Sequence, residues 1–343
     1  MFLVGDIGGT HARLSLLDAS GKVLRKEEYA SAKYPSLEAV AMEFIGGGRG
    51  RGGGKSAKGA VKAAAFGVAG PVVKGRVAAT NLRWTIDERI ISRKLGIKKV
   101  TLLNDLVALS LGALQAKPAK LHRLNDAGLP KKKGANIAVI AAGTGLGEAM
   151  LLWDGQRFIP SATEGGHTDF AARDDLEVEL LQFLRGRFGR VSWERILSGA
   201  GLGNLYDFFC QGKGMIETPE NAQAIGAAQD RNAVIGALGT SGKSEPAARA
   251  SELFASIYGA EAGNLALKTL SLGGVYVCGN IAAKMLPILD RGVFRRAFTD
   301  KGRMGKVMET IPIAVVLDSE IGLAGAASVA LDPAAVRDGR RKR

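Results

Sequence analysis

Leu102-Leu103-Asn104-Asp105-Leu106-Val107 is the stretch that decides the fold. An apolar run from Val100 to Leu103 predicts a buried strand, and the polar pair that follows it predicts a helix beginning near Asp105. A carboxylate and an amide would then stand at the carboxyl end of a strand, where open α/β sheets bind their ligands. Asp105 could equally be no more than the N-cap of that helix, because Asp is a preferred cap residue.

Two other segments have the pattern of a strand, a glycine turn and a second strand. The first covers residues 2–17 with the turn Asp6-Ile7-Gly8-Gly9-Thr10, and the second covers residues 137–153 with the turn Gly143-Thr144-Gly145. Glycine lets backbone N–H groups approach an anion without a Cβ in the way, so both turns suit phosphate, although an ordinary hairpin has the same pattern. Asp6 is placed to hold a metal ion or the water bound to one.

Glu164-Gly165-Gly166-His167 predicts a turn that binds a polyhydroxylated ligand, because the carboxylate accepts hydrogen bonds from hydroxyls and the imidazole can bond another. Glu194 is a further hydroxyl acceptor or a helix-dipole partner. Asn81 could offer its amide to the ligand or satisfy its own loop, as turn Asn residues commonly do. His11 and His122 are predicted to be structural.

Ala237-Leu238-Gly239-Thr240-Ser241-Gly242-Lys243-Ser244 approximates the phosphate-binding loop of nucleoside triphosphatases. That motif needs a glycine in place of Ala237 and a strand before it, whereas the preceding segment 221–238 has the pattern of a helix. We therefore expect a loop between helices and no phosphate site.

The length of 343 residues, with 46% hydrophobic residues, predicts two domains. We expect a small α/β domain over residues 1–113, completed by a strand and a helix at 313–331, and a larger α/β domain over 114–312. The glycine-rich basic segment 46–59 and the basic tail 332–343 cannot bury enough apolar surface to fold, so we expect both to be disordered.

A formal net charge of +14 and a pI near 9.8 raise the question of a nucleic-acid partner. The excess lies in short basic runs typical of solvated loops, without a basic recognition helix, so we expect no nucleic acid. A basic surface also suits a polyanionic substrate such as ATP. With two cysteines, no basic secretory leader and no long apolar run, we expect a cytoplasmic protein without disulfides, zinc or membrane spans.

In their order and spacing, these motifs resemble the bacterial ATP-dependent glucokinases of the sugar kinase, heat-shock ATPase and actin superfamily, over nearly all of residues 2–331. The resemblance rests on Gly5-Asp6-Ile7-Gly8-Gly9-Thr10, Leu103-Asn104-Asp105, Gly143-Thr144-Gly145-Leu146-Gly147, Glu164-Gly165-Gly166-His167, Arg190-Val191-Ser192-Trp193-Glu194-Arg195-Ile196-Leu197-Ser198-Gly199 and Gly273-Gly274-Val275-Tyr276. It implies a two-domain actin-like ATPase (ribonuclease H-like) fold with an interdomain cleft, and phosphoryl transfer from Mg-ATP to the 6-hydroxyl of glucose.

The resemblance makes Asp105 the general base. The candidate hexose ligands are Asn81, Asn104, Asp105, Glu164, His167 and Glu194. The candidate ATP ligands are Asp6, Gly8, Gly9, Thr10, Gly143, Thr144, Gly145, Gly273, Gly274, Gly279 and Asn280. Mg²⁺ would be held mainly by the phosphates, with Asp6 reaching it through water, and the family suggests a homodimer. The family usually has Asn where this chain has His11 and Gly where it has Asn280, which bears on the nucleotide.

Three alternatives remain open on the sequence. A kinase of the same architecture could act on mannose, fructose or an amino sugar, because single hydroxyls decide between epimers. A sugar-responsive transcription regulator of the related repressor-kinase group would need a helix-turn-helix segment before the first strand and a cysteine cluster, and this sequence shows neither. A third alternative is a catalytically idle protein that binds sugar or nucleic acid.

Overall fold

The computed structural model describes residues 1–47, 59–78, 84–131 and 133–332. Contacts divide the chain into two compact units. The first unit comprises Met1–Ala116, Ile159–Ala162 and Asp318–Arg343, and the second comprises Lys117–Phe158 and Thr163–Leu317. Each unit is built on a β-sheet with helices packed against it, so the predicted α/β class is confirmed.

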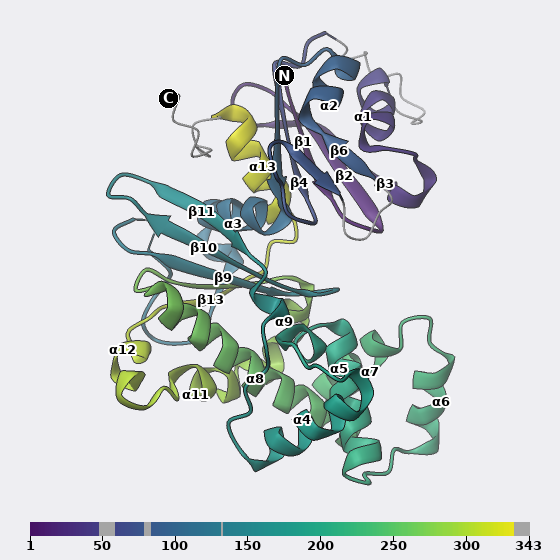
Figure 1. The fold of residues 1–343 in the computed structure, drawn as a ribbon, viewed down its shortest axis with the longest axis vertical. Coiled ribbons are helices and arrows are strands. Elements are labelled where there is room, and N and C mark those ends of the chain that lie inside the picture. Colours follow the sequence, from purple (N-terminus) through teal and green to yellow (C-terminus); the bar gives the residue numbers. More distant parts are fainter. Residues whose placement is uncertain (48–58, 79–83, 132, 333–343) are drawn as a thin grey trace. The chain divides into compact units, whose positions relative to one another are not determined.

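A five-stranded sheet forms the centre of the first unit, in the order β3-β2-β1-β4-β7 (Figure 1). Its strands are β1 (Phe2–Ile7), β2 (His11–Leu17), β3 (Val23–Ala30), β4 (Ala63–Val68) and β7 (Lys99–Asn104). The first three form the predicted antiparallel meander, whereas β4 and β7 run parallel to β1. A short hairpin, β5 (Arg76–Ala78) and β6 (Thr85–Asp87), is separate from this sheet.

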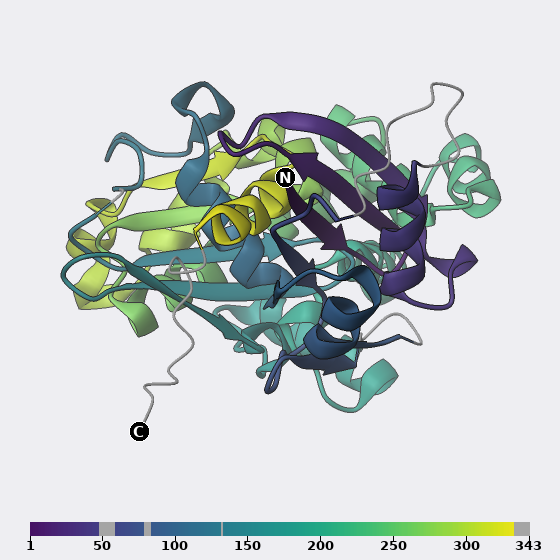
Figure 2. The same cartoon turned by 90° about the horizontal axis from the view of Figure 1, so that it is seen from above.

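Helices cover both faces of this first sheet. Helices α1 (Leu37–Gly46) and α2 (Glu88–Leu95) lie on one face, and α3 (Asp105–Gln115) and α13 (Ile321–Leu331) lie on the other. Figure 2 shows α13, in yellow, beside the purple strand β1. Alternate side chains of a strand point to opposite faces, which explains why Leu3 and Ile7 belong to the core under α1 while Asp6 faces Gly322 of α13.

A six-stranded sheet in the order β11-β10-β9-β12-β13-β8 belongs to the second unit, except that Ile159–Ala162 of β11 are grouped with the first unit. Its strands are β8 (Leu121–Arg123), β9 (Ile137–Ala142), β10 (Leu146–Trp153), β11 (Phe158–Thr163), β12 (Gly274–Cys278) and β13 (Ile313–Val316). The long helix α8 (Glu245–Thr269) packs on this sheet, and its Phe254 and Tyr258 are fully buried.

Shorter helices complete the second unit. They are α4 (Asp175–Phe188), α5 (Gly199–Asp207), α6 (Pro219–Ala227), α7 (Arg231–Ser241), α9 (Asn280–Lys284), α10 (Leu286–Leu289), α11 (Val293–Thr299) and α12 (Gly305–Glu309), with the 3-10 turns η2 (Pro118–Lys120), η3 (Gly165–His167), η4 (Trp193–Arg195) and η6 (Gly302–Met304). The first unit has one such turn, η1 (Ser31–Lys33), and a π-helical turn, η5 (Phe208–Gly212), follows α5.

Two predictions about these elements were wrong. The strand and helix at 313–331 were both expected to complete the first domain, but β13 pairs with β12 and β8 in the second sheet, and only α13 packs in the first unit. All four residues of β13 are apolar and buried, so its sequence does not indicate which sheet it joins. The expected loop at 237–244 is largely the last turns of α7, which end at the left-handed Gly242.

Cys210 and Cys278 are both free. Among the described helices, none combines the length and the apolarity that a membrane span needs. Most of the segment 46–59 and nearly all of the tail 332–343 lie outside the described residues.

Candidate active site

The first glycine turn joins β1 to β2 at Asp6–Thr10. Its backbone is fixed by Gly8 N–H, which donates to the His11 carbonyl at 2.9 Å, and by the Ser31 hydroxyl, which donates to the Gly8 carbonyl at 3.0 Å. Burial raises the pKa of the Asp6 carboxyl, and the Arg13 guanidinium, 3.8 Å away, opposes that shift. Asp6 is therefore a half-buried acid beside a rigid glycine turn.

Asp105 is the first residue of α3, directly after β7. The N-cap is Asn104, whose Oδ1 accepts from the N–H groups of Leu106 at 2.9 Å and Val107 at 3.3 Å. The Asn104 Nδ2 donates to the Gly70 carbonyl at 3.1 Å, which joins the start of α3 to the loop after β4. Asp105 Oδ1 also accepts from the Leu106 N–H at 2.9 Å.

The strand register places Asp105 and the Asp6–Thr10 turn at one edge of the first sheet. Ile7 at the end of β1 pairs with Val68 of β4, and Val68 pairs with Asn104 of β7. The three strands are parallel, so their carboxyl ends meet at the same edge, with neighbouring strands roughly 5 Å apart. The open-sheet rule that a ligand lies beyond this edge therefore applies to both segments.

In the second unit, the turn Gly143–Gly145 between β9 and β10 contacts Glu194 of η4. The Glu194 Oε2 accepts from the Leu146 N–H at 3.0 Å, and a Cβ on Gly145 would lie 2.2 Å from that same oxygen. Gly143 is fixed from another side, because its carbonyl accepts from the Gly199 N–H at 2.9 Å. Residue 145 must be glycine for Glu194 to approach the turn.

Three predicted hexose ligands come together in the second unit. His167 Nδ1 lies 3.9 Å from Glu194 Oε1, and His167 Nε2 lies 3.9 Å from Glu164 Oε2. The side chains of Glu164 and His167 are 65% and 61% exposed, so polar groups of all three residues face solvent beside one another. Two carboxylates that flank an imidazole form a surface of hydroxyl acceptors and donors.

The turns η3 and η4, which carry His167 and Glu194, contact each other directly. The Thr168 carbonyl accepts from the Trp193 N–H at 3.1 Å, and the rings of Phe170 and Trp193 meet edge to face at 5.1 Å. Both rings are buried. The turns η3 and η4 are therefore fixed to one another by backbone and aromatic contacts, which orients His167 toward Glu194.

A cavity of about 850 Å³ opens between helices of the second unit. It is lined by Gly143, Thr144, Gly199, Ala200, Leu202, Asp230, Asn232, Ala233, Gly236, Ala237, Thr240, Ser241, Asn280, Ile281, Lys284 and Met285. The volume and the mainly small or apolar lining suit a flat base and its ribose. The cavity includes the turn residues Gly143 and Thr144, where phosphate was predicted.

Some of the predicted ATP ligands line this cavity and others lie outside it. Asn280 lines it, but Gly273 and Gly274 lie at the opposite end of β12, against Asn136 and Pro130, and do not. The signal that could have found the α7 wall is the spacing of Ala233, Gly236, Ala237 and Thr240, which are small residues on one helical face.

The remaining predicted residues are less informative. Asn81 lies outside the described residues. His122 is bonded to Asp290 at 2.7 Å, as a structural histidine would be, and His11 lies 3.7 Å from Glu28. In the described part of the chain, no three residues among His, Cys, Asp and Glu come together as a metal site.

Solved structures share this fold. A glucokinase from an Antarctic psychrotroph has a TM-score of 0.78 and 29% identity, over 95% of this chain and 97% of that one. A glucokinase from Streptomyces griseus, solved with glucose and AMPPNP, has a TM-score of 0.63 and 22% identity, over 96% and 98%, and shows likeness of fold alone. The fold places this protein among the sugar kinases of the actin-like ATPase fold, as predicted.

Comparison of sequences defines the family more closely. A glucokinase family model matches residues 3–333. The glucokinase of Nostoc punctiforme is 36% identical over 343 aligned residues, which cover 95% of this chain and 98% of that protein. The chain belongs to the glucokinase family, and the resemblance read from its motifs is confirmed.

Proposed function

We propose that this protein transfers the γ-phosphoryl group of ATP to the 6-hydroxyl of glucose. Membership of the glucokinase family supports an ATP-dependent hexose kinase. The observation that carries the residue assignment is the register of the first sheet, which places Asp105 at the same edge as the Asp6–Thr10 turn. A carboxylate at the same sheet edge as a glycine turn that suits phosphate supports phosphoryl transfer to an alcohol.

Asp105 is proposed as the general base. It would accept the proton of the 6-hydroxyl as that oxygen attacks the γ-phosphorus, and the leaving group would be ADP. Glu164, His167 and Glu194 are proposed to bind other hydroxyls of the sugar, and Asn104 to hold the start of α3 so that Asp105 keeps its position. Orientation of the attacking oxygen accounts for most of the rate enhancement in reactions of this kind.

The nucleotide is proposed to occupy the cavity of the second unit. Its base and ribose would lie along α7 and α9, and its phosphates would extend toward Gly143 and Thr144. Asn280 and Lys284 are four residues apart on α9 and both line the cavity, so the lysine brings a positive charge toward a polyanionic ligand. Gly279 remains in the proposal as the residue before Asn280, whereas Gly273 and Gly274 are withdrawn.

Mg²⁺, a homodimer and a cytoplasmic location also belong to the proposal and rest on the family resemblance. Mg²⁺ would neutralise charge on the phosphates, and Asp6 is the described carboxylate proposed to reach it through water. Turnover should then require Mg²⁺, and light scattering during gel filtration should give twice the chain mass of 35.9 kDa.

The proposal is tested by coupled detection of ADP release across glucose, mannose, fructose and glucosamine, with ATP, GTP and polyphosphate as donors. We expect the highest kcat/KM for glucose with ATP, and far slower ADP release when no sugar is present. A higher kcat/KM for another hexose would make that hexose the preferred substrate in place of glucose. Tight sugar binding without any turnover would favour the transcription regulator.

A further inference from the structure

Glu148 is a buried acid that the proposed mechanism does not use. It lies in β10 with 1% of its surface exposed. Its carboxyl has another acid, Glu261, as a hydrogen-bond partner, and its Oε1 receives no hydrogen bond from an N–H group in the described part of the chain. Burying a carboxyl group without a full set of partners costs free energy, and the cost is much higher for the charged form. The buried Glu148 carboxyl is therefore a candidate for a role at the neighbouring turn of Glu164 and His167.

The carboxyl of Glu148 lies directly beneath the turn that carries Glu164 and His167. A Cβ on Gly165 would stand 2.0 Å from Glu148 Oε2, so the acid occupies the space that a side chain at 165 would need. The backbone is connected as well, because the Thr163 hydroxyl donates to the Glu148 carbonyl at 3.2 Å and accepts from the Gly165 N–H at 3.1 Å. A movement of the Glu148 side chain would therefore be transmitted to Gly165.

Glu148 faces a second buried acid, Glu261 of α8, which is 0% exposed. Burial and the negative charge of Glu261 raise the pKa of Glu148 to about 8, while the more distant Lys268 lowers it. Burial also raises the pKa of Glu261, although Asn264 donates to it at 2.8 Å and Lys268 lies 3.5 Å away. Two carboxyls in one apolar site favour a state in which one keeps its proton.

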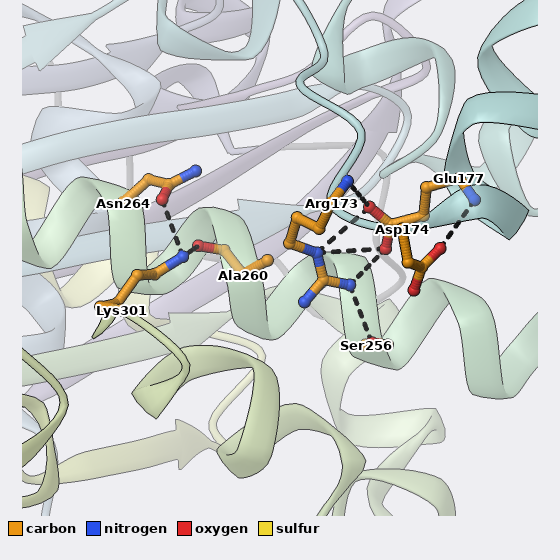
Figure 3. Close-up of polar contacts among 7 residues, drawn as sticks. All are labelled: Arg173, Asp174, Glu177, Ser256, Ala260, Asn264 and Lys301. Atoms are coloured by element: carbon orange, nitrogen blue, oxygen red, sulfur yellow. Dashed lines mark hydrogen bonds and ion pairs between the residues drawn. The ribbon is translucent and has the colours of Figure 1, made fainter.

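Other polar groups around this pair are already engaged. Lys301 donates to the Ala260 carbonyl at 3.1 Å and to Asn264 Oδ1 at 2.8 Å, as Figure 3 shows. The hydroxyl of Tyr258, also on α8, contacts β9 through the Ala142 N–H at 3.1 Å. On the side of the turn, Glu164 and His167 are the titratable groups next to Gly165. Lys268 is the cation that lowers the pKa of Glu148, and its ammonium group lies 3.5 Å from Glu261.

We propose that Glu148 is a positioning residue for the hexose, whose neutral form supports the Gly165 turn and whose ionised form displaces it and weakens sugar binding. The inference rests on the proposed function, in which Glu164 and His167 contact the sugar. An ionised Glu148 would repel Glu261 and need water, and its Oε2 already lies against Gly165 on the side of the turn. The hexose turn would then move while the nucleotide cavity, lined by other residues, would not.

The test is calorimetric titration of glucose into the full-length protein between pH 6 and pH 9, beside the same titration with AMPPNP. If only the neutral form binds well, the glucose Kd of the wild type rises about tenfold from pH 7 to pH 9, because the protonated fraction of a group titrating near pH 8 falls about tenfold. Glu148→Gln keeps the shape and loses the proton, so its glucose Kd should stay near the wild-type pH 7 value throughout.

Glu177→Gln is the matched control, because Glu177 is another fully buried acid of the same unit. It is paired with Arg173, which also donates to the Ser256 hydroxyl at 3.0 Å (Figure 3). This variant should keep the wild-type pH dependence of glucose binding. The AMPPNP Kd should change alike with pH in all three proteins.

Two outcomes overturn the inference. One is a wild-type glucose Kd that does not rise toward pH 9, and the other is a glucose Kd of Glu148→Gln that rises with pH as the wild-type value does. Glu164→Gln separates this from failure of the proposed function. If Glu164→Gln weakens glucose binding at least tenfold while Glu148→Gln shows the wild-type pH dependence, only the role of Glu148 fails. If it binds glucose as the wild type does, the hexose site is wrong and the role of Glu148 falls with it.

Discussion

At the scale of single residues, Asn104 and Asp105 have different roles. The sequence allowed Asp105 to be either the N-cap of α3 or the general base, and in the structure the N-cap is Asn104. Asn104 accepts from two N–H groups of α3 and donates to Gly70, so the cap of the helix does not depend on Asp105. A carboxylate at the first position of a helix also interacts favourably with the helix dipole.

Replacing Asp105 by Asn should lower kcat by about 10²- to 10⁴-fold, because the amide cannot accept the hydroxyl proton. Glucose binding, measured by calorimetry, should remain within a few-fold of the wild type, and the thermal midpoint should change little since Asn104 still caps α3. The contrasting variant Asn104→Ala should instead lose about 1 kcal/mol of stability. Nearly full turnover in Asp105→Asn would exclude Asp105 as the base.

At the scale of elements, α3 is positioned by its crossing with α13. A Cβ on Gly112 of α3 would lie 1.8 Å from the Ile321 carbonyl, and a Cβ on Gly325 of α13 would lie 1.7 Å from the Ala108 carbonyl. Two glycines therefore let the helix backbones touch at two points, closer than side chains would allow. Since Asp105 begins α3, this crossing also fixes the position of the proposed base.

Gly325→Ala should destabilise the protein by about 1–3 kcal/mol, because the new methyl group meets backbone that cannot turn away. It should also lower kcat, since α3 must shift. Gly186→Ala is the matched control: Gly186 lies in α4 with nothing within 4 Å of its would-be Cβ, and Ala there should add about 0.5–1 kcal/mol through helix propensity. Urea unfolding measures both, and equal effects would contradict the crossing argument.

At the scale of the whole molecule, the acid pair of the second unit predicts how stability depends on pH. In the folded protein, burial and the negative charge of Glu261 raise the pKa of Glu148 from its ordinary value of 4.5 to about 8. Between those values the folded protein holds a proton that the unfolded chain has released. The free energy of unfolding should therefore fall as pH rises from about 4.5 to about 8, by at most about 1.4 kcal/mol per pH unit for one proton.

Glu148→Gln should remove this contribution, so the variant should become more stable relative to the wild type as pH rises through that window. Urea unfolding of both proteins at half-unit steps from pH 5 to pH 9 gives the difference, because titratable groups remote from Glu148 contribute equally to both proteins. A difference that stays constant with pH would show that Glu148 does not carry the extra proton.

The sequence by itself determined the local features. The meander, the two glycine turns, the strand that ends at Asn104 and the helix that starts at Asp105 were all read correctly, because strand alternation, glycine turns and helix caps depend on neighbouring residues. The family followed from the same motifs in their order.

Only the tertiary structure decided which distant segments meet. In it, β13 belongs to the second sheet, and residues of α5, α7 and α9 line the cavity, whereas Gly273 and Gly274 do not. Glu148 lies against Gly165 and Glu261. The physical reason is that an apolar strand or a buried acid has no preferred partner in its own segment. The partner is chosen by packing between residues far apart in the chain, such as 148 and 261.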